Sequence, residues 1–104
     1  MSLKEIFAKN LKELRKRNKM TQEQLAELVN VAPRHISFIE TGRSFPSCEL
    51  LERICKVLQV DFTEVIKTEE NLTREELLQK LNTIVPKLND VQLNYLVKLA
   101  KELY

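Results

Sequence analysis

The feature that most constrains this chain is a helix-start signal that recurs along the whole sequence. In a capping box, a Ser, Thr, Asp or Asn side chain accepts a hydrogen bond from the backbone N–H three residues later, and a Glu or Gln side chain at that later position accepts one in return. Repeated signals of this kind predict an all-α fold. Five such pairs stand before apolar runs: Ser2 with Glu5, Thr21 with Gln24, Asp61 with Glu64, Thr73 with Glu76, and Asn89 with Gln92.

The apolar residues around these signals recur at the i, i+3 and i+4 spacing of an amphipathic helix. The spacing predicts five helices within residues 1–67. Gly42 is expected to end the third helix, and Pro46 with Ser47 to begin the fourth. The expected core-facing residues are Leu3, Ile6, Phe7, Leu11 and Leu14, then Leu25, Leu28 and Val29, then Ile36 and Ile39, then Leu50, Leu51, Ile54, Cys55 and Leu58, and finally Phe62, Val65 and Ile66.

A polar stretch over residues 67–71 separates these helices from two further amphipathic segments. The sequence thus predicts a domain over 1–67 and a helical hairpin over 72–104. A two-helix hairpin lies below the size that usually supports its own core, so its apolar residues are expected to pack on the first five helices, on a second copy, or on both. These residues are Leu77, Leu78, Leu81, Ile84 and Val85 before Pro86, and then Val91, Leu93, Leu96, Val97, Ala100, Leu103 and Tyr104.

Composition excludes several classes of protein. One Gly and three Pro are too few for a turn-rich sandwich or a low-complexity chain. Cys48 and Cys55 are too few for a disulfide scaffold or a zinc knuckle, and their spacing suits two buried thiols on one helix face in a reducing compartment. No apolar run approaches the ~18 residues of a membrane span, and residues 1–20 lack the apolar stretch of a secretory signal. We therefore expect a soluble cytoplasmic protein with no membrane partner.

The sequence offers little material for catalysis, which requires convergent polar groups with perturbed pKa values. It contains one His, no Gly-rich phosphate loop, no cluster at metal-ligand spacing and no nucleophile near a base. We therefore expect no enzyme activity, metal, cofactor or small-molecule ligand.

The formal net charge of +2 is small, but the charges are unevenly distributed. Residues 1–20 hold seven Lys or Arg side chains against two Glu, whereas residues 21–70 hold more acidic side chains than basic ones. Such asymmetry is typical of a protein with one side that faces a polyanion. The alternative interpretation is a first helix that is simply well solvated.

Residues 21–41 carry the most specific signal in the sequence. They read as two short helices joined by a turn of three or four residues, which form a helix-turn-helix if they cross closely. Ala26 is small enough to allow this approach. Asn30 tolerates the left-handed conformation that such a turn usually needs, and Val31 is expected to fill the corner between the helices.

The second of these helices has two distinct faces when its residues are placed at 100° intervals. Ile36 and Ile39 mark the face expected to lie on the core. The opposite face includes a phenylalanine, which is unusual on a solvated surface. It suits a surface that meets DNA base edges, because thymine methyl groups offer an apolar contact and arginine bonds guanine through two hydrogen bonds. The residues of this opposite face are Arg34, Ser37, Phe38 and Thr41.

On these residues, the segment 11–66 resembles the helix-turn-helix family of phage repressors and Cro proteins, also called xenobiotic-response-element-type regulators. The resemblance implies a five-helix, lambda-repressor-like DNA-binding domain whose recognition helix, 33–41, enters the major groove of double-stranded DNA, usually as a dimer on a palindromic operator. It is carried by Thr21 and Gln22, Leu25 and Ala26, Val31, Ile36 and Ser37, Ile39 and Glu40, Gly42, Pro46 and Ser47, and Leu50 and Leu51.

The resemblance also implies roles for single residues. The chain departs from the family pattern at Asn30, which replaces a turn glycine, and at Ala32, which replaces a serine cap and is partly offset by the fixed φ of Pro33. The implied base-reading residues are Pro33, Arg34, Ser37 and Phe38, and the implied contacts to the DNA backbone are Gln22, Thr41 and Arg43.

Each assignment has a structural alternative. Arg34 can pair with Glu23 or Glu27 on the surface, and Phe38 can pack on the following loop or at a subunit contact. His35 lies off the base-reading face, so it is expected to pack or to contact a phosphate. The basic side chains Lys12, Arg15 and Arg17 either follow the DNA backbone or are merely solvated, and the acidic side chains Glu23, Glu27 and Glu40 are expected to have partners within the chain.

Two alternatives concern the protein as a whole. The main prediction is a transcriptional repressor that dimerises through residues 72–104. The alternative to DNA binding is a protein-interaction module of the same fold, which binds a toxin or an antirepressor. The alternative to dimerisation is a hairpin that closes as a flap on its own chain.

Overall fold

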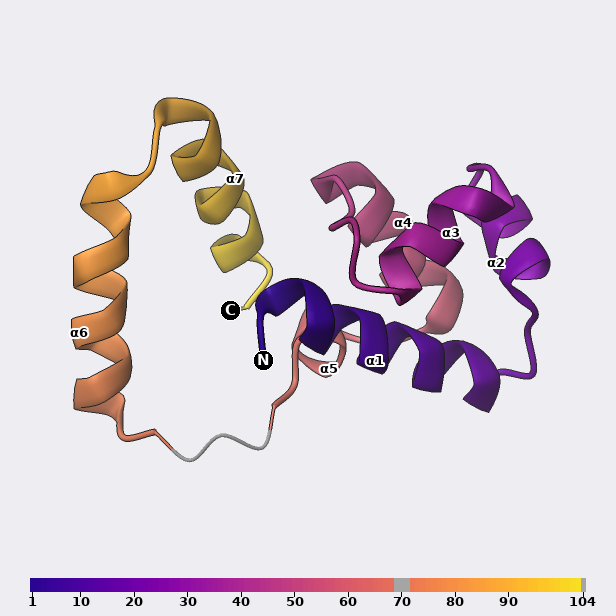
Figure 1. Ribbon diagram of the computed structural model, residues 1–104, viewed down its shortest axis with the longest axis horizontal. Helices are drawn as coiled ribbons and strands as arrows, with labels where there is room; N and C mark the ends of the chain where they lie inside the picture. The colour runs from indigo at the N-terminus through magenta and orange to yellow at the C-terminus, as the bar shows by residue number, and fades with distance from the viewer. Residues whose placement is uncertain (69–71, 104) are drawn as a thin grey trace. The chain divides into compact units, whose positions relative to one another are not determined.

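The computed structural model describes residues 1–68 and 72–103, which form two compact units that divide after Thr68. Residues 69–71 of the predicted polar boundary, and Tyr104, lie outside the described residues. All regular structure in the described residues is helical, so the predicted all-α fold is confirmed. Unit 1 contains α1 (Leu3–Arg17), α2 (Gln22–Leu28), α3 (Pro33–Glu40), α4 (Cys48–Leu58) and α5 (Phe62–Val65), and unit 2 contains α6 (Arg74–Ile84), the short 3-10 helix η1 (Val85–Lys87) and α7 (Asp90–Lys101) (Figure 1).

The predicted helix starts are confirmed most fully at three positions. Ser2, Thr21 and Asn89 form complete capping boxes at the starts of α1, α2 and α7. Thr73 caps α6 through its own side chain, which accepts from the backbone three residues on. The capping box predicted at Asp61 is wrong, because its side chain makes no capping hydrogen bond to the four-residue α5.

The four longer helices of unit 1 all end in the same way. Lys19, Asn30, Gly42 and Gln59 have φ values of 58°, 60°, 78° and 55°, in the left-handed region. The N–H of each following residue donates to the carbonyl oxygen five residues earlier, which is the Schellman motif that satisfies the last carbonyl groups of a helix. The expected turns at Asn30 and Gly42 are therefore confirmed. Lys19 and Gln59 carry no such signal, because Lys and Gln do not favour this conformation.

The core of unit 1 lies where α3 packs against both α1 and α2 (Figure 1). The short α5 packs on α1, where the Asn10 side-chain amide donates to the carbonyl oxygens of Val65 and Lys67, each at 3.0 Å. Each fully buried leucine or isoleucine stabilises the fold by about 1.5–3 kcal/mol. The buried apolar residues are Phe7, Ala8, Leu11, Leu14, Leu25, Ala26, Val29, Ile36, Ile39, Leu50, Leu51, Ile54, Leu58, Phe62 and Val65.

Some of the expected core residues are not buried. Leu3 and Leu28 are exposed, Leu28 by 57%. They are the first residue of α1 and the last residue of α2, and a helix end can project beyond the neighbours that cover its middle. Cys48 and Cys55 both lie on α4 but are only half-buried, so the prediction of two buried thiols is wrong.

Unit 2 is different, because neither α6 nor α7 buries any side chain. The predicted end of its first helix near Pro86 is confirmed, since α6 ends at Ile84 and Pro86 lies in η1. Helices with no fully buried side chain, and with only a few half-buried ones such as Leu96 and Leu99, have little to stabilise them in water, where isolated helices of this length are marginal. The exposed apolar residues of unit 2 are Leu77, Leu78, Leu81, Ile84, Val91, Leu93, Val97 and Leu103.

Candidate functional site

The two faces predicted for α3 are confirmed. Ile36 and Ile39 are completely buried, whereas Arg34 and Phe38 are exposed and Ser37 is half-buried. Ala32 caps the helix without a side-chain hydrogen bond, and the proline that follows stands in its first turn. The buried isoleucines hold α3 on unit 1 from one side, so its other side is free to meet a ligand.

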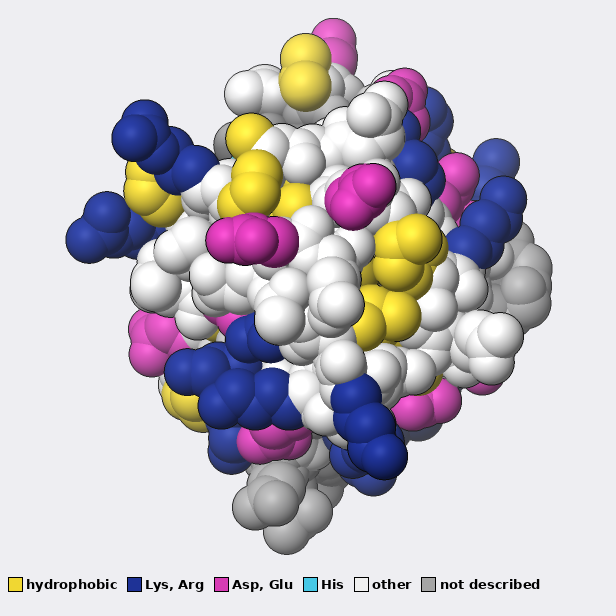
Figure 2. Space-filling view, turned by 90° about the vertical axis from the view of Figure 1, so that its right-hand side faces the viewer, with side chains coloured by type: hydrophobic (Ala, Val, Ile, Leu, Met, Phe, Trp, Pro, Cys, Tyr) yellow, Lys and Arg dark blue, Asp and Glu magenta, His cyan; other side chains and the backbone are white. Residues whose placement is uncertain are grey.

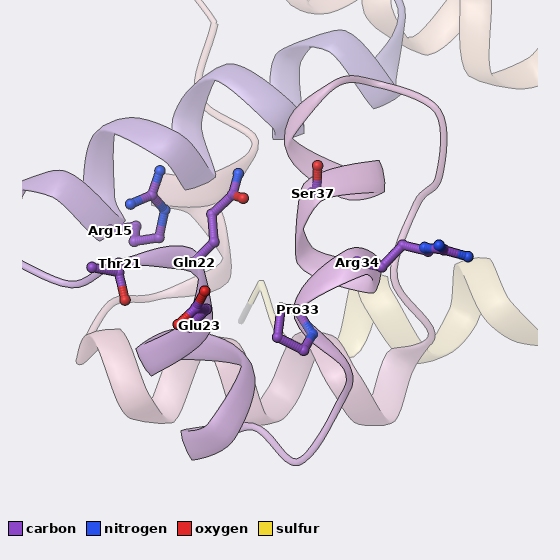
Figure 3. Close-up of a pocket in the computed structure, with 7 residues that line it drawn as sticks. All are labelled: Arg15, Thr21, Gln22, Glu23, Pro33, Arg34 and Ser37. Carbon is purple, nitrogen blue, oxygen red and sulfur yellow. The ribbon is translucent and has the colours of Figure 1, made fainter.

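An open hollow lies beside this outer face, between α2 and the first turns of α3. Figure 3 shows Gln22 at the start of α2 and Ser37 on α3 beside it, while the long side chain of Arg34 extends away from the other residues. Arg34 forms no ion pair with either Glu23 or Glu27, so the structural alternative in which one of these carboxylates neutralises its charge on the surface is absent. The hollow is lined by Arg15, Thr21, Gln22, Glu23, Pro33, Arg34 and Ser37.

A buried charged network joins the three helices around the hollow. Arg15 of α1 donates from Nε to Glu40 Oε2 at 2.6 Å and from Nη2 to Glu40 Oε1 at 3.0 Å. Its Nη1 donates to the carbonyl oxygen of Met20 at 2.7 Å. The Gln22 amide of α2 also donates to Glu40 Oε1, at 3.0 Å. Glu40 at the end of α3 therefore fixes the positions of both α1 and α2.

The network corrects the interpretation of Arg15 as a contact to the DNA backbone. Its side chain is 9% exposed and that of Glu40 only 2%, so the guanidinium is held inside the protein. The hydrogen bond to Glu40 raises the pKa of Arg15 above its ordinary value, despite the opposing effect of burial. Arg15 follows Phe7 and Leu11 at four-residue intervals on the buried face of α1, and Glu40 follows the buried Ile36 by four residues on α3. These two positions on buried helix faces are the sequence signal that predicts a buried pair.

The structure also describes the surroundings of Thr41 and His35. Thr41 donates its hydroxyl proton to the carbonyl oxygens of Ser37 at 3.0 Å and Phe38 at 3.2 Å. Thr41 is exposed, so the backbone-contact role implied for it stays a prediction. His35 is exposed, so it does not pack in the core, and its expected contact to a phosphate stays a prediction.

A second cluster of predicted residues lies at the other end of α3. Phe38 is 39% exposed, and the guanidinium carbon of Arg43 lies 5.8 Å from the centre of its ring. This distance is within the range of a cation–π interaction. The outer surface of α3 therefore carries two groups. Pro33, Arg34 and Ser37 lie beside the hollow, and Phe38 in the last turn pairs with Arg43, which follows the helix.

The surface around the site carries charges of both signs. Figure 2 looks onto the end of unit 1 that bears α2 and shows basic side chains gathered in its lower part, with acidic ones interspersed. Lys12 and Arg17 of α1 are exposed and can meet an anion. Among residues 1–68 and 72–103, no group of His, Cys, Asp and Glu is placed to hold a metal ion. No helix in the same residues is long and apolar enough to cross a membrane.

Known proteins are similar to this chain in sequence and in fold. Residues 11–65 match the family described as Helix-turn-helix. The solved structure of the clp gene regulator ClgR from C. glutamicum superposes with a TM-score of 0.60 and 32% sequence identity, over 64% of this chain and 85% of that one.

Two relatives carry names that state opposite directions of regulation, an activator and a repressor. The HTH-type transcriptional activator BcrR of Enterococcus faecalis is 37% identical over 76 residues, or 73% of this chain and 37% of that protein. The immunity repressor protein of Bacillus phage phi105 is 36% identical over 66 residues, or 64% of this chain and 45% of that protein. The matched segment thus spans less than half the length of either relative.

Proposed function

The chain belongs to the helix-turn-helix family, of the Cro/C1 type found in transcriptional regulators, and from this premise we propose that it binds specific double-stranded DNA sequences with α3 in the major groove. The proposed base-reading residues are Pro33, Arg34, Ser37 and Phe38, and the proposed contacts to the DNA backbone are Gln22, Thr41, Arg43, Lys12 and His35.

The observation that carries this proposal is the two-sided character of α3. Ile36 and Ile39 are completely buried, while Arg34 and Phe38 project on the outer side. The major groove is about 12 Å wide and admits a single helix presented in this way. Glu40 also holds Gln22 in place beside α3 by a 3.0 Å hydrogen bond, so a neutral hydrogen-bond donor stands where it can meet the phosphates that flank the groove.

The test is selection of bound duplexes from a random oligonucleotide pool with the intact chain, followed by affinity measurements over a range of salt. We expect enrichment of one sequence, in two half-sites about 10 base pairs apart or a multiple of this, and an affinity that falls steeply as salt rises. If no duplex is retained even at low salt, the proposal is wrong. A protein partner that binds with little salt dependence would instead support the interaction module.

Arg34→Ala is expected to relax the choice of base at one position of each half-site and to weaken binding by about 1–3 kcal/mol, because a paired contact to guanine is lost. The measurement is fluorescence anisotropy with the selected duplex and with duplexes changed at single positions.

Gln22→Ala is expected to weaken binding evenly on every sequence, because its amide is proposed to meet a phosphate rather than a base. The same set of duplexes measures this effect. Equal losses on all sequences for both Arg34→Ala and Gln22→Ala would show that Arg34 does not read a base.

We further propose that the chain binds as a homodimer through residues 72–104. Two recognition helices must lie about 34–36 Å apart to meet successive major grooves, which requires a fixed interface. The exposed leucines of α6 and α7 are the apolar surface that such an interface would bury. Sedimentation equilibrium of the intact chain is expected to give twice the 12.2 kDa mass of one chain. A monomer at micromolar concentration would exclude this dimer and favour the flap.

Repression is the proposed direction of regulation, and it is supported by the similarity to the phage immunity repressor. A compact DNA-binding dimer can repress by covering a promoter. With the selected duplex placed across a reporter promoter, expression of the chain is expected to lower transcription. An increase would instead match the activity named for the activator relative.

A further inference from the structure

The pairing of Phe38 with Arg43 is built into the way α3 ends. Gly42, with φ at 78°, reverses the chain after the last turn. The Arg43 N–H then donates to the Phe38 carbonyl oxygen at 2.9 Å, and the Ser44 N–H reaches the same oxygen at 3.3 Å. These backbone bonds bring Arg43 next to the residue five positions before it, so its place over the ring does not depend on the side chains alone.

The same position after the other long helices of unit 1 is apolar. Met20, Val31 and Val60 follow the left-handed residues after α1, α2 and α4. An apolar residue is the usual choice there, because a Schellman motif commonly includes a hydrophobic contact between this residue and the one it bonds to. After α3 a cation takes that place and lies over an aromatic ring that remains 39% exposed. Helix termination alone requires neither the charge nor the exposed ring.

We propose that Phe38 and Arg43 act as one unit that recognises the 5-methyl group of a thymine in the major groove. The inference rests on the proposed binding of DNA by α3. The thymine methyl is the apolar group that base edges present in this groove, and Phe38 is the large apolar side chain exposed on α3. Arg43 holds the ring from one side and brings its charge towards the phosphates, so the rest of the ring is left for the methyl group.

The inference also places the thymine relative to the base read by Arg34. Phe38 lies four residues after Arg34, which is about 6 Å along the helix axis. Successive bases of one strand are about 3.4 Å apart. The thymine is therefore expected within about two base pairs of the position whose choice Arg34→Ala relaxes.

The test replaces each thymine of the selected duplex, one at a time, with deoxyuridine, which removes only the 5-methyl group. With the intact wild-type chain, removal of the methyl group from one thymine in each half-site is expected to lower the affinity about fourfold. This factor corresponds to the free energy gained by burying one methyl-sized group. Phe38→Ala is expected to bind the thymine and deoxyuridine duplexes equally. Leu28→Ala, which removes an exposed apolar side chain from α2, is the matched control and is expected to keep the fourfold ratio.

Arg43→Lys tests whether the two residues act together. Lysine keeps the positive charge but lacks the planar guanidinium that stacks on a ring, so the ratio of affinities for the thymine and deoxyuridine duplexes is expected to fall towards one, whatever the change in overall affinity. An unchanged ratio in Arg43→Lys would overturn the joint role of the pair.

The outcomes separate this inference from the proposed function. If the chain selects a duplex but every thymine can be replaced without loss, DNA binding stands and methyl recognition is wrong. A methyl preference that survives in Phe38→Ala would also overturn the inference, because another residue would then read the methyl. If no duplex is selected at all, it is the proposed function that fails.

Discussion

Glu40→Ala is expected to destabilise unit 1 by about 3–5 kcal/mol, because it leaves the Arg15 guanidinium charged, buried and without its counterion. The substitution also removes the hydrogen-bond acceptor of Gln22. A small domain is typically stable by about 5–15 kcal/mol, so this is a large share of the total. Urea unfolding followed by far-ultraviolet circular dichroism measures the change.

Two further variants make this prediction specific. Glu52→Ala removes an exposed carboxylate from α4 and is expected to change the stability by no more than about 0.5 kcal/mol. The double variant Arg15→Met with Glu40→Leu replaces the pair with apolar side chains and is expected to recover most of the loss, because no charge is then left unpaired inside. A loss below about 1 kcal/mol for Glu40→Ala would show that the pair is open to solvent.

Most of the fold follows from local signals in the sequence. Capping boxes such as those at Ser2 and Thr21 are formed within four residues, so they can be recognised directly in the sequence. The left-handed turn after α3 is likewise indicated by a single residue, Gly42. The conformations of Lys19 and Gln59 are not, because neither residue type favours positive φ and the Schellman bonds of the finished helix impose it. Helix starts can therefore be predicted here more reliably than helix ends.

The site is predicted less completely, because its key contacts join distant parts of the chain. The periodicity of α3 correctly places Ile36 inside and Phe38 outside. The pairing of Arg15 with Glu40 spans 25 residues and depends on how α1 packs against α3. A charge count assigns Arg15 to the basic surface, although its place in the buried stripe of α1 argues against this. In this chain, position on a helix face predicts burial better than residue type does.

The strength of operator binding is expected to depend on unit 2, although unit 2 carries none of the proposed base-reading residues. When two DNA-binding units are linked, the second half-site is bound at a high effective concentration, which raises the overall affinity by about 10²–10⁴ without any new contact. A symmetric interface contains each residue twice, so one substitution changes two contacts in the dimer. Substitution of the exposed leucines of α6 and α7 is therefore the most sensitive way to separate dimerisation from base reading.

Leu81→Lys is accordingly expected to convert the dimer to a monomer and to weaken binding to the two-half-site duplex by about 10²-fold or more. Leu81 is 45% exposed on α6, and lysine is a good helix former, so the helix itself is expected to remain. Sedimentation equilibrium and anisotropy on duplexes with one and two half-sites measure the two effects, and binding to a single half-site is expected to change little. Leu28→Lys on α2, which exchanges another exposed leucine for the same charge, serves as the control and is expected to remain dimeric. A Leu81→Lys chain that stays dimeric with full affinity would exclude this face of α6 as the subunit contact.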